Sequence, residues 1–189
     1  MIAGIGYLAV CALVAIRHEP KPPPTPPPAP PLTPVVAGFD GPAAEWFAAI
    51  KPFCNTVEVE VMQARHPAPG TVEGLGYSAA CYALGSRITH AAAVIDHLLP
   101  EDRARAAGIV FNVGHPIADA GDDASAGPMM ELVLDYWPDH YMALYHAGMS
   151  EYAMRKPDLA RQHLTSFLQY YHADDGWTRN ARDVLARLQ

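Results

Sequence analysis

The side chains best suited to chemistry in this chain are its nine histidines, because a neutral imidazole can bind a metal ion or transfer a proton. His90 and His97 are seven residues apart, and His140 and His146 are six apart. Neither spacing is the i, i+4 interval of a helical zinc motif, and no carboxylate stands at a signature interval from them. We interpret the histidines as surface or groove residues, with a metal- or haem-handling site as the alternative.

A second group with chemical potential is the set of carboxylates at Asp119, Asp122 and Asp123. They lack the alternation of a calcium-binding loop, so we expect them to cap a helix. The sequence contains no glycine-rich phosphate loop, no nucleophile elbow and no pair of catalytic acids. It therefore predicts a protein that is not an enzyme and that has neither a metal site nor a cofactor.

The chain has three cysteines, and Cys11 lies in an apolar N-terminal run. The remaining two, Cys54 and Cys81, have neither metal-site spacing nor the pattern of a disulfide-rich framework. They can form one disulfide in an oxidising compartment, or they can stay two buried thiols. Both interpretations stay open at this point.

Charge restricts the partners. The formal net charge is −7, which argues against nucleic acid, because binding its backbone needs clustered Lys and Arg. Between Asp96 and Glu151 there are ten acidic residues against only Arg103 and Arg105. This segment is either a solvated helix surface or an electronegative face that steers a basic partner.

The first 19 residues are expected to form a membrane anchor. Residues 2–16 are uncharged and almost entirely apolar, and we expect them to contact lipid. The run is short for a full span, which usually takes ~20 residues, and the alternative is a signal peptide. No basic residue precedes the run and no clear small-x-small cleavage site follows it, which favours an uncleaved anchor.

A proline-rich linker is expected over residues 20–40. Ten of the fifteen residues from Pro20 to Pro34 are proline. Such a segment adopts an extended polyproline conformation, and at ~3.1 Å per residue it reaches about 45 Å. It is either a spacer or a Pro-x-x-Pro ligand of a recognition domain.

Two features give contrary indications of the side of the membrane on which the helical domain lies. Arg17 and Lys21 would lie in the cytoplasm by the positive-inside rule. The proline-rich stretch, however, resembles the spacers that carry bacterial domains from the inner membrane into the periplasm. We expect a single-pass protein of the bacterial inner membrane with its helical domain in the periplasm.

Residues 41–189 have the pattern of an all-α domain. Ala, Leu, Met and Glu abound, and apolar residues recur at intervals of three and four. A first helical segment is expected from Pro42 to His66, with Pro52 either kinking it or starting a second helix. The run from Pro67 to Gly70 should end this segment.

The helical region also contains an internal repeat. Gly114 and Gly148 are 34 residues apart, and their surroundings recur in kind. The matching pairs are Val110 with Leu144, Phe111 with Tyr145, Val113 with Ala147, Ala126 with Ala160, Met130 with Leu164, Val133 with Phe167 and Leu134 with Leu168. A 34-residue period with Gly or Ala at the helix crossings resembles the tetratricopeptide-repeat (TPR) family. The resemblance implies a stack of helix-turn-helix repeats at about residues 69–102, 107–140 and 141–174, with a capping helix at 175–189.

In such a stack, small residues lie where the two helices of a repeat touch. This places Gly114 against Ala126, and Gly148 against Ala160, with Gly76 as the equivalent residue of the weaker first copy. Between the helices of the second copy, Gly121 should adopt a positive φ and Asp122 or Asp123 should cap the next helix. In the third copy the turn ends at Pro157, which should start a helix.

The resemblance also implies a concave groove lined by the first helix of each repeat. By register, the groove residues are Phe111, Asn112, His115, Asp119, Met142, Tyr145, His146, Met149 and Tyr152. Aromatic and methionine side chains suit an interaction surface, although several can instead pack against a neighbouring helix. Only Asn112 matches the residues with which chaperone-binding members clamp a C-terminal carboxylate, so that ligand is not supported. Pro116 interrupts this helix, either as a tolerated kink or as a means of opening the groove.

Together these features predict a non-catalytic subunit that binds other proteins. We expect a membrane-tethered docking module, or a structural or accessory subunit of a larger membrane complex. A free periplasmic adaptor or assembly chaperone is the alternative. The repeat pattern alone does not choose among them, because such repeats serve many tasks.

Overall fold

The computed structural model describes residues 42–188, and all the regular secondary structure in this range is helical. The helices are α1 (Ala43–Ile50), the short 3-10 helix η1 (Lys51–Phe53), α2 (Val59–Arg65), α3 (Val72–Leu84), α4 (Ile88–Asp96), α5 (Pro100–Asp119), α6 (Asp123–Tyr136), α7 (Tyr141–Ala153), α8 (Pro157–Tyr170) and α9 (Gly176–Arg187). The prediction of an all-α domain is confirmed for these residues. The expected membrane anchor at 1–19 and the linker at 20–40 lie outside them. Within 42–188, no helix combines the length and apolarity that crossing a membrane requires.

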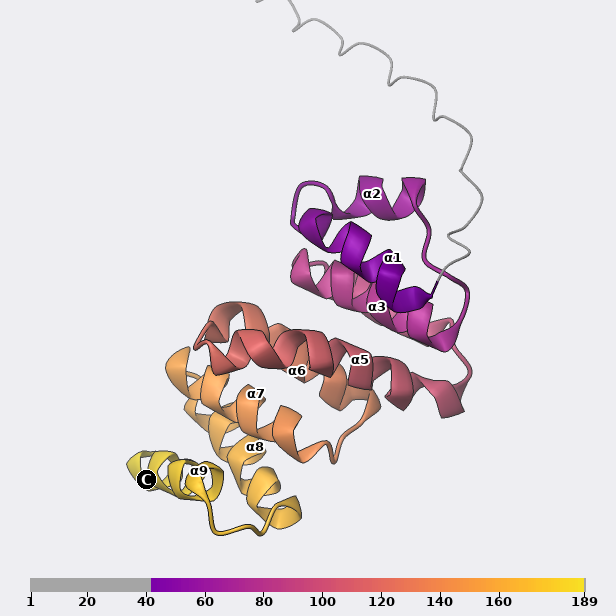
Figure 1. The fold of residues 1–189 in the computed structure, drawn as a ribbon. Helices are drawn as coiled ribbons and strands as arrows, with labels where there is room; N and C mark the ends of the chain where they lie inside the picture. The colour runs from indigo at the N-terminus through magenta and orange to yellow at the C-terminus, as the bar shows by residue number, and fades with distance from the viewer. Residues whose placement is uncertain (1–41, 189) are drawn as a thin grey trace, which may run out of the picture. The chain divides into compact units, whose positions relative to one another are not determined.

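Consecutive helices pack in an antiparallel arrangement that is repeat-like (Figure 1). α3 contacts both α4 and α5, α5 contacts α6, α6 contacts α7, and α7 contacts α8. α6 and α8 begin 34 residues apart, at Asp123 and Pro157, which is the interval of the sequence repeat. α9 packs on α7 and α8 and ends the described chain.

Local signals at the helix ends behave as their residue types predict. Gly121 has a φ of +80°, and the carboxylate of Asp122 accepts a hydrogen bond from the Ser125 amide, which caps α6. Asp175 and Thr178 form a reciprocal capping box at the start of α9. Pro157 occupies the first position of α8, where its missing N–H is harmless.

The first helical segment, expected from Pro42 to His66 with a kink or the start of a second helix at Pro52, consists of three helices. α1 ends at Ile50, Pro52 lies in η1, and α2 starts only at Val59. Pro52 is the second residue of the short helix η1, and α1 does not continue through it because a proline cannot supply the amide hydrogen bond of a continuing helix. α2 returns along α1, and the Trp46 indole donates to the carbonyl of His66.

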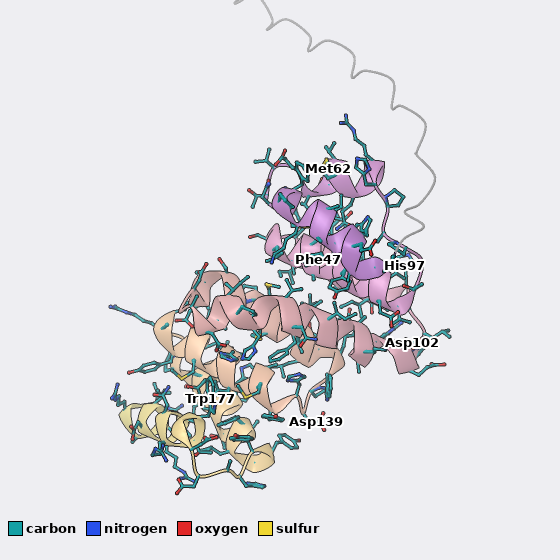
Figure 2. The ribbon with its side chains drawn as sticks, in the orientation of Figure 1. Phe47, Met62, His97, Asp102, Asp139 and Trp177 are labelled. Atoms are coloured by element: carbon teal, nitrogen blue, oxygen red, sulfur yellow. A yellow bond between two sulfur atoms is a disulfide. The ribbon has the colours of Figure 1, made fainter. Side chains whose placement is uncertain are left out.

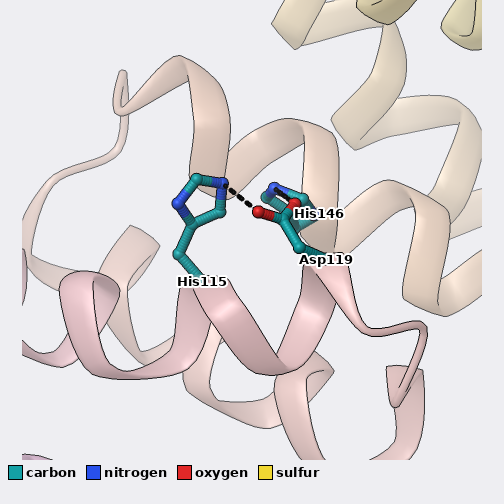
Figure 3. Close-up of side chains that lie close together, drawn as sticks. All are labelled: His115, Asp119 and His146. Carbon is teal, nitrogen blue, oxygen red and sulfur yellow. Dashed lines mark ion pairs between the residues drawn. The ribbon is translucent and has the colours of Figure 1, made fainter.

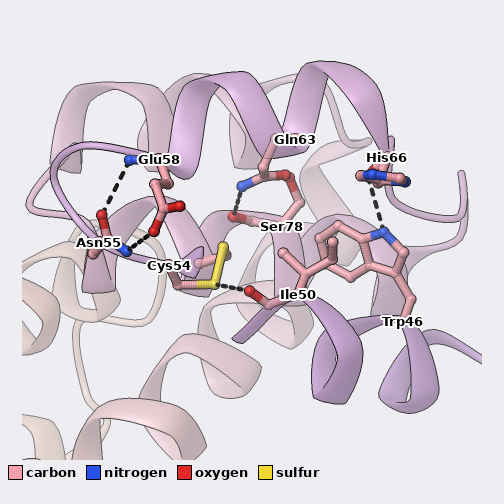
Figure 4. The surroundings of a disulfide bond; sticks show 9 residues. Trp46, Ile50, Cys54, Asn55, Glu58, Gln63, His66 and Ser78 are labelled. Carbon is pink, nitrogen blue, oxygen red and sulfur yellow. Dashed lines mark hydrogen bonds between the residues drawn. A yellow bond between two sulfur atoms is a disulfide. The ribbon is translucent and has the colours of Figure 1, made fainter. Parts of the chain in front are cut away.

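A disulfide joins Cys54, just after η1, to Cys81 in α3 (Figure 4). Both cysteines belong to a core cluster with Trp46 of α1 and Val59 of α2. Phe47, labelled in Figure 2, stacks on Tyr77 of α3 with 4.8 Å between the ring centres. The disulfide therefore attaches the first two helices to the third within an apolar cluster.

The repeat glycines mark close approaches between helices. A Cβ on Gly148 would lie 2.7 Å from Leu164, and one on Gly114 would lie 2.8 Å from Met130, two residues that are themselves 34 apart. Ala126 and Ala160 are the residues that the sequence placed opposite these glycines. Both are buried, Ala126 in α6 with Met130 and Ala160 in α8 with Leu164. Each glycine thus leaves room for a large side chain of the second helix.

The first copy is packed differently. A Cβ on Gly76 would meet Ile109 and Ala106 of α5, in the following helix pair. α5 starts at Pro100, so residues 103–106, which were expected between the first two copies, belong to this helix. The helix continues through Pro116 to Asp119.

Candidate functional site

A cavity of about 840 Å³ opens where α3 and α5 meet the connection between α6 and α7. Its lining is mainly apolar and includes Glu73, Arg105, Ile109, Phe111, Asn112, Trp137, Asp139, His140, Tyr141 and Met142. Trp137 is 39% exposed and Tyr141 is 42% exposed, which is unusual for rings of this size. Figure 2 labels Asp139 at this connection.

Aromatic and imidazole rings connect this cavity to the interior of the helix stack. Trp137 contacts His140 edge-on at 4.6 Å, and His140 lies 4.2 Å from Phe111, measured between ring centres. Phe111 then stacks on His115 at 4.9 Å, and His115 meets His146 at 4.8 Å. The rings therefore pass from the exposed cavity to a buried histidine.

His140 also ends the connection as the N-cap of α7. Its Nδ1 accepts a hydrogen bond of 3.2 Å from the Ala143 amide. Burial lowers the pKa of His140, and the charge of His115 acts in the same direction, while Asp139 opposes it. The neutral imidazole is the form that can accept this bond, since a protonated ring has only donors.

His115 and His146 point toward the same carboxylate, that of Asp119 (Figure 3). His115 Nε2 lies 3.5 Å from Asp119 Oδ2, and His146 Nε2 lies 3.7 Å from Asp119 Oδ1. His115 and Asp119 lie one turn apart at the C-terminal end of α5, and His146 lies in the middle of α7. Two helices therefore bring two imidazoles and one carboxylate together.

The polar atoms of this cluster differ in exposure. His146 is 5% exposed and Asp119 is 47% exposed. The Nε2 atoms of both histidines are buried and have no hydrogen-bond partner in the part of the chain that the structure describes. Burial, followed by the neighbouring His115, lowers the pKa of His146 to about 4, and Asp119 only partly offsets this. His146 is therefore a neutral imidazole at physiological pH.

The residues expected to line a groove fall into three groups. Phe111, Asn112 and Met142 line the cavity, and His115, Asp119 and His146 form the cluster beside it. Tyr145, Met149 and Tyr152 instead belong to the core cluster beneath α9.

Tyr145 is the clearest of the covered residues. It is 5% exposed, its hydroxyl accepts a hydrogen bond from the Asn180 amide, and its ring contacts Trp177, which Figure 2 labels on α9. The groove was expected from the register of the 34-residue repeat, which ends before α9. In the structure, α9 covers this face of α7.

Sequence reasoning missed two features of the site. His115 and Asp119 have an i, i+4 spacing that is visible in the sequence, whereas the spacing of histidine pairs does not reveal the cluster. Trp137 and Tyr141 lie on either side of the boundary between the copies at 107–140 and 141–174, and the repeat register does not assign them to the groove.

A second buried titratable group lies on the opposite side of α7. Glu151 is fully buried, and its Oε2 lies 2.8 Å from His163 Nδ1 of α8, beside a cavity of about 410 Å³. Burial raises the pKa of Glu151, and His163 opposes that effect. Glu151 and His163 pair with each other and pack between α7 and α8, so we regard them as structural.

Comparison with known proteins gives no relative from which a function can be transferred. No family model matches the chain. No curated protein and no solved structure matches it either. The cavity beside α5 and the cluster of His115, Asp119 and His146 are therefore the features that can indicate a function.

Proposed function

We propose that residues 42–188 form a TPR-like docking module that binds a segment of another protein in the cavity beside α5. The proposed binding surface consists of Phe111, Trp137, His140, Tyr141 and Met142. The module would act without catalysis, as an accessory or structural subunit of a membrane complex.

The observation that carries this proposal is the exposure of Trp137 and Tyr141 at an apolar cavity. Exposing large rings costs free energy in water, and aromatic anchors in concave, apolar surroundings are typical of binding hot spots. His140 contacts the ring of Trp137, and Phe111 contacts His140 in turn, which limits the conformational entropy that Trp137 loses on binding.

Charge indicates the chemistry of the partner. Glu73 and Asp139 line the cavity, and Arg105, its basic residue, pairs with Glu73. The helices from Asp96 to Glu151 carry ten acidic residues against two arginines. A partner segment that combines an apolar anchor with Lys or Arg would be complementary to this surface.

The finer features of the proposal come from the sequence. The 34-residue period supports a TPR-like stack, and the apolar run at 2–16 with the proline-rich stretch supports a membrane tether. The Cys54–Cys81 disulfide favours an oxidising compartment, which agrees with a periplasmic domain. A free periplasmic adaptor or assembly chaperone would use the same cavity.

A cross-linking experiment tests the cavity. A photo-reactive phenylalanine analogue replaces Tyr141 in the tagged full-length chain, and membranes are solubilised gently after illumination. We expect one partner in fixed ratio, and weakening of its recovery by Trp137→Ala, since truncating a hot spot costs roughly 2 kcal/mol or more. The matched control carries the same analogue at Tyr170, an exposed ring on α8 outside the cavity.

The outcomes separate the candidate roles. Integral membrane subunits in fixed ratio support an accessory subunit, and a soluble client in variable amount supports an adaptor or chaperone. Equal cross-linking from positions 141 and 170, insensitive to Trp137→Ala, would rule out the cavity as the docking site.

A further inference from the structure

The strongest unassigned feature of the described residues is the cluster of His115, Asp119 and His146 (Figure 3). One ligand atom of each residue lies within 4.8 Å of the others. The spacing of histidine pairs alone had predicted no metal site. The cluster combines residues 31 positions apart, because α5 and α7 pack side by side.

Within residues 42–188, the Nε2 nitrogens of the two histidines lack a hydrogen-bond partner. Both Nε2 atoms are buried and form no hydrogen bond with another described residue, although each lies near a different oxygen of Asp119. Leaving a buried polar atom without a hydrogen bond destabilises the folded state. Two such atoms aimed at one point therefore indicate a group that binds between them.

The position of Asp119 adds an electrostatic reason. It is the last residue of α5, where the partial negative charge of the helix end disfavours a carboxylate. Asp122 and Asp123 follow within four residues, and no Lys or Arg pairs with Asp119 among the described ion pairs. A cation at this point would stabilise the carboxylate of Asp119.

We propose that His115, Asp119 and His146 bind one divalent transition-metal ion of the zinc type. Two imidazole nitrogens and one carboxylate oxygen suit Zn²⁺ and its first-row neighbours, whereas Ca²⁺ and Mg²⁺ prefer oxygen ligands. Ligand bonds of ~2.0–2.2 Å require the three atoms to approach by roughly 1 Å, which side-chain rotation can supply. Three protein ligands leave a further coordination position, on the side where Asp119 is exposed.

The surroundings would hold the ion in a defined place. Phe111 stacks on His115, and Trp177 and Tyr145 contact His146 edge-on. These rings fix both imidazoles and exclude water from one side of the site. Because Phe111 also contacts His140, bound metal would order the wall of the docking cavity.

The test is titration of the purified, chelator-treated full-length chain with Zn²⁺ alone, followed by calorimetry. We expect one saturable site per chain and a rise in the midpoint of thermal unfolding. Asp119→Asn keeps the size of an exposed side chain and should weaken Zn²⁺ binding roughly tenfold or more. His146→Gln should do the same, and circular dichroism checks that each variant is folded.

Two controls remove other metal ligands. His172→Gln removes an exposed histidine in the connection before α9, and Cys11→Ser removes the cysteine outside the disulfide. Both variants should bind Zn²⁺ as the unaltered chain does. Absence of saturable binding, or equal affinity in Asp119→Asn, would overturn the proposal. Co²⁺ absorption provides a second readout, since nitrogen and oxygen ligands give visible bands without thiolate charge transfer.

Discussion

At the scale of single residues, His140 combines two tasks in one imidazole. Its Nδ1 caps α7 by accepting from the Ala143 amide, and its ring packs between Phe111 and Trp137. A proton on Nδ1 would replace the accepting lone pair by a donor facing another donor. It would also place a positive charge at the N-terminus of a helix, where the dipole disfavours it.

This gives a pH dependence with a defined sign. Burial lowers the folded-state pKa of His140 below 6.5, so the unfolded chain binds more protons as the pH falls below that value. The contribution of His140 to stability is therefore complete above pH 6.5 and is lost as the pH falls through the lowered pKa. Urea unfolding at pH 7.5 and at pH 5, with a chelator present, should show the loss.

Two substitutions at the same position separate charge from capping. His140→Asn keeps a capping oxygen but does not titrate, and His140→Ala lacks both. At pH 7.5 the Ala variant should be about 1 kcal/mol less stable than the Asn variant. Both variants should lose the part of the pH dependence due to His140, and an unchanged slope would contradict the assignment.

At the scale of elements, the repeat depends on helix pairs that approach closely at glycines. Gly148 faces Leu164, and a Cβ there would come within 2.9 Å of two side-chain atoms and 3.2 Å of a backbone nitrogen. Gly108 of α5 faces only the ring of Trp137, at 3.5 Å. The same residue type therefore has a packing role at one position and none at the other.

We predict opposite effects of the same substitution at these glycines. Gly148→Ala should lower the free energy of unfolding, because overpacking a core costs ~1–3 kcal/mol and outweighs the gain in helix propensity. Gly108→Ala should raise it by ~0.5–1 kcal/mol, since alanine favours the helix and meets no clash. Denaturant unfolding of both variants measures the difference, and equal signs would disprove the packing role of Gly148.

The sequence predicted these elements well wherever their determinants are local or periodic. The turn at Gly121, the start of α8 at Pro157 and the capping helix after Asp175 are specified by side chains within a few residues. The prediction was weakest where packing decides: η1 separates α1 from α2, and α9 covers Tyr145. The cluster of His115, Asp119 and His146 could not be predicted without the pairing of α5 with α7, which brings His146 beside Asp119.

At the scale of the whole domain, the core is divided into three apolar clusters along the chain. The first joins α1, α2 and α3, and contains the Cys54–Cys81 disulfide. The third joins α7, α8 and α9. α1 and α2 are short and contact mainly α3, so the disulfide should matter most for their attachment.

Reduction of the disulfide should destabilise the domain by roughly 3–4 kcal/mol, because it releases a loop constraint in the unfolded chain. The cysteines are 27 residues apart, which sets this estimate. Urea unfolding with and without a reductant measures it. A Cys54→Ala/Cys81→Ala chain should match the reduced protein and should not respond to the reductant; equal stability of oxidised and reduced protein would contradict the prediction.

The same disulfide determines how the domain would bear mechanical load applied at its N-terminal end. A pull at Pro42 could unwind α1 and η1, but at Cys54 the covalent bond passes the force directly to Cys81 in α3. The intervening residues, including all of α2, would carry no tension. The chain would therefore extend by only about a dozen residues, those before Cys54. The cavity beside α5 would keep its form under a force that unfolds the first helix.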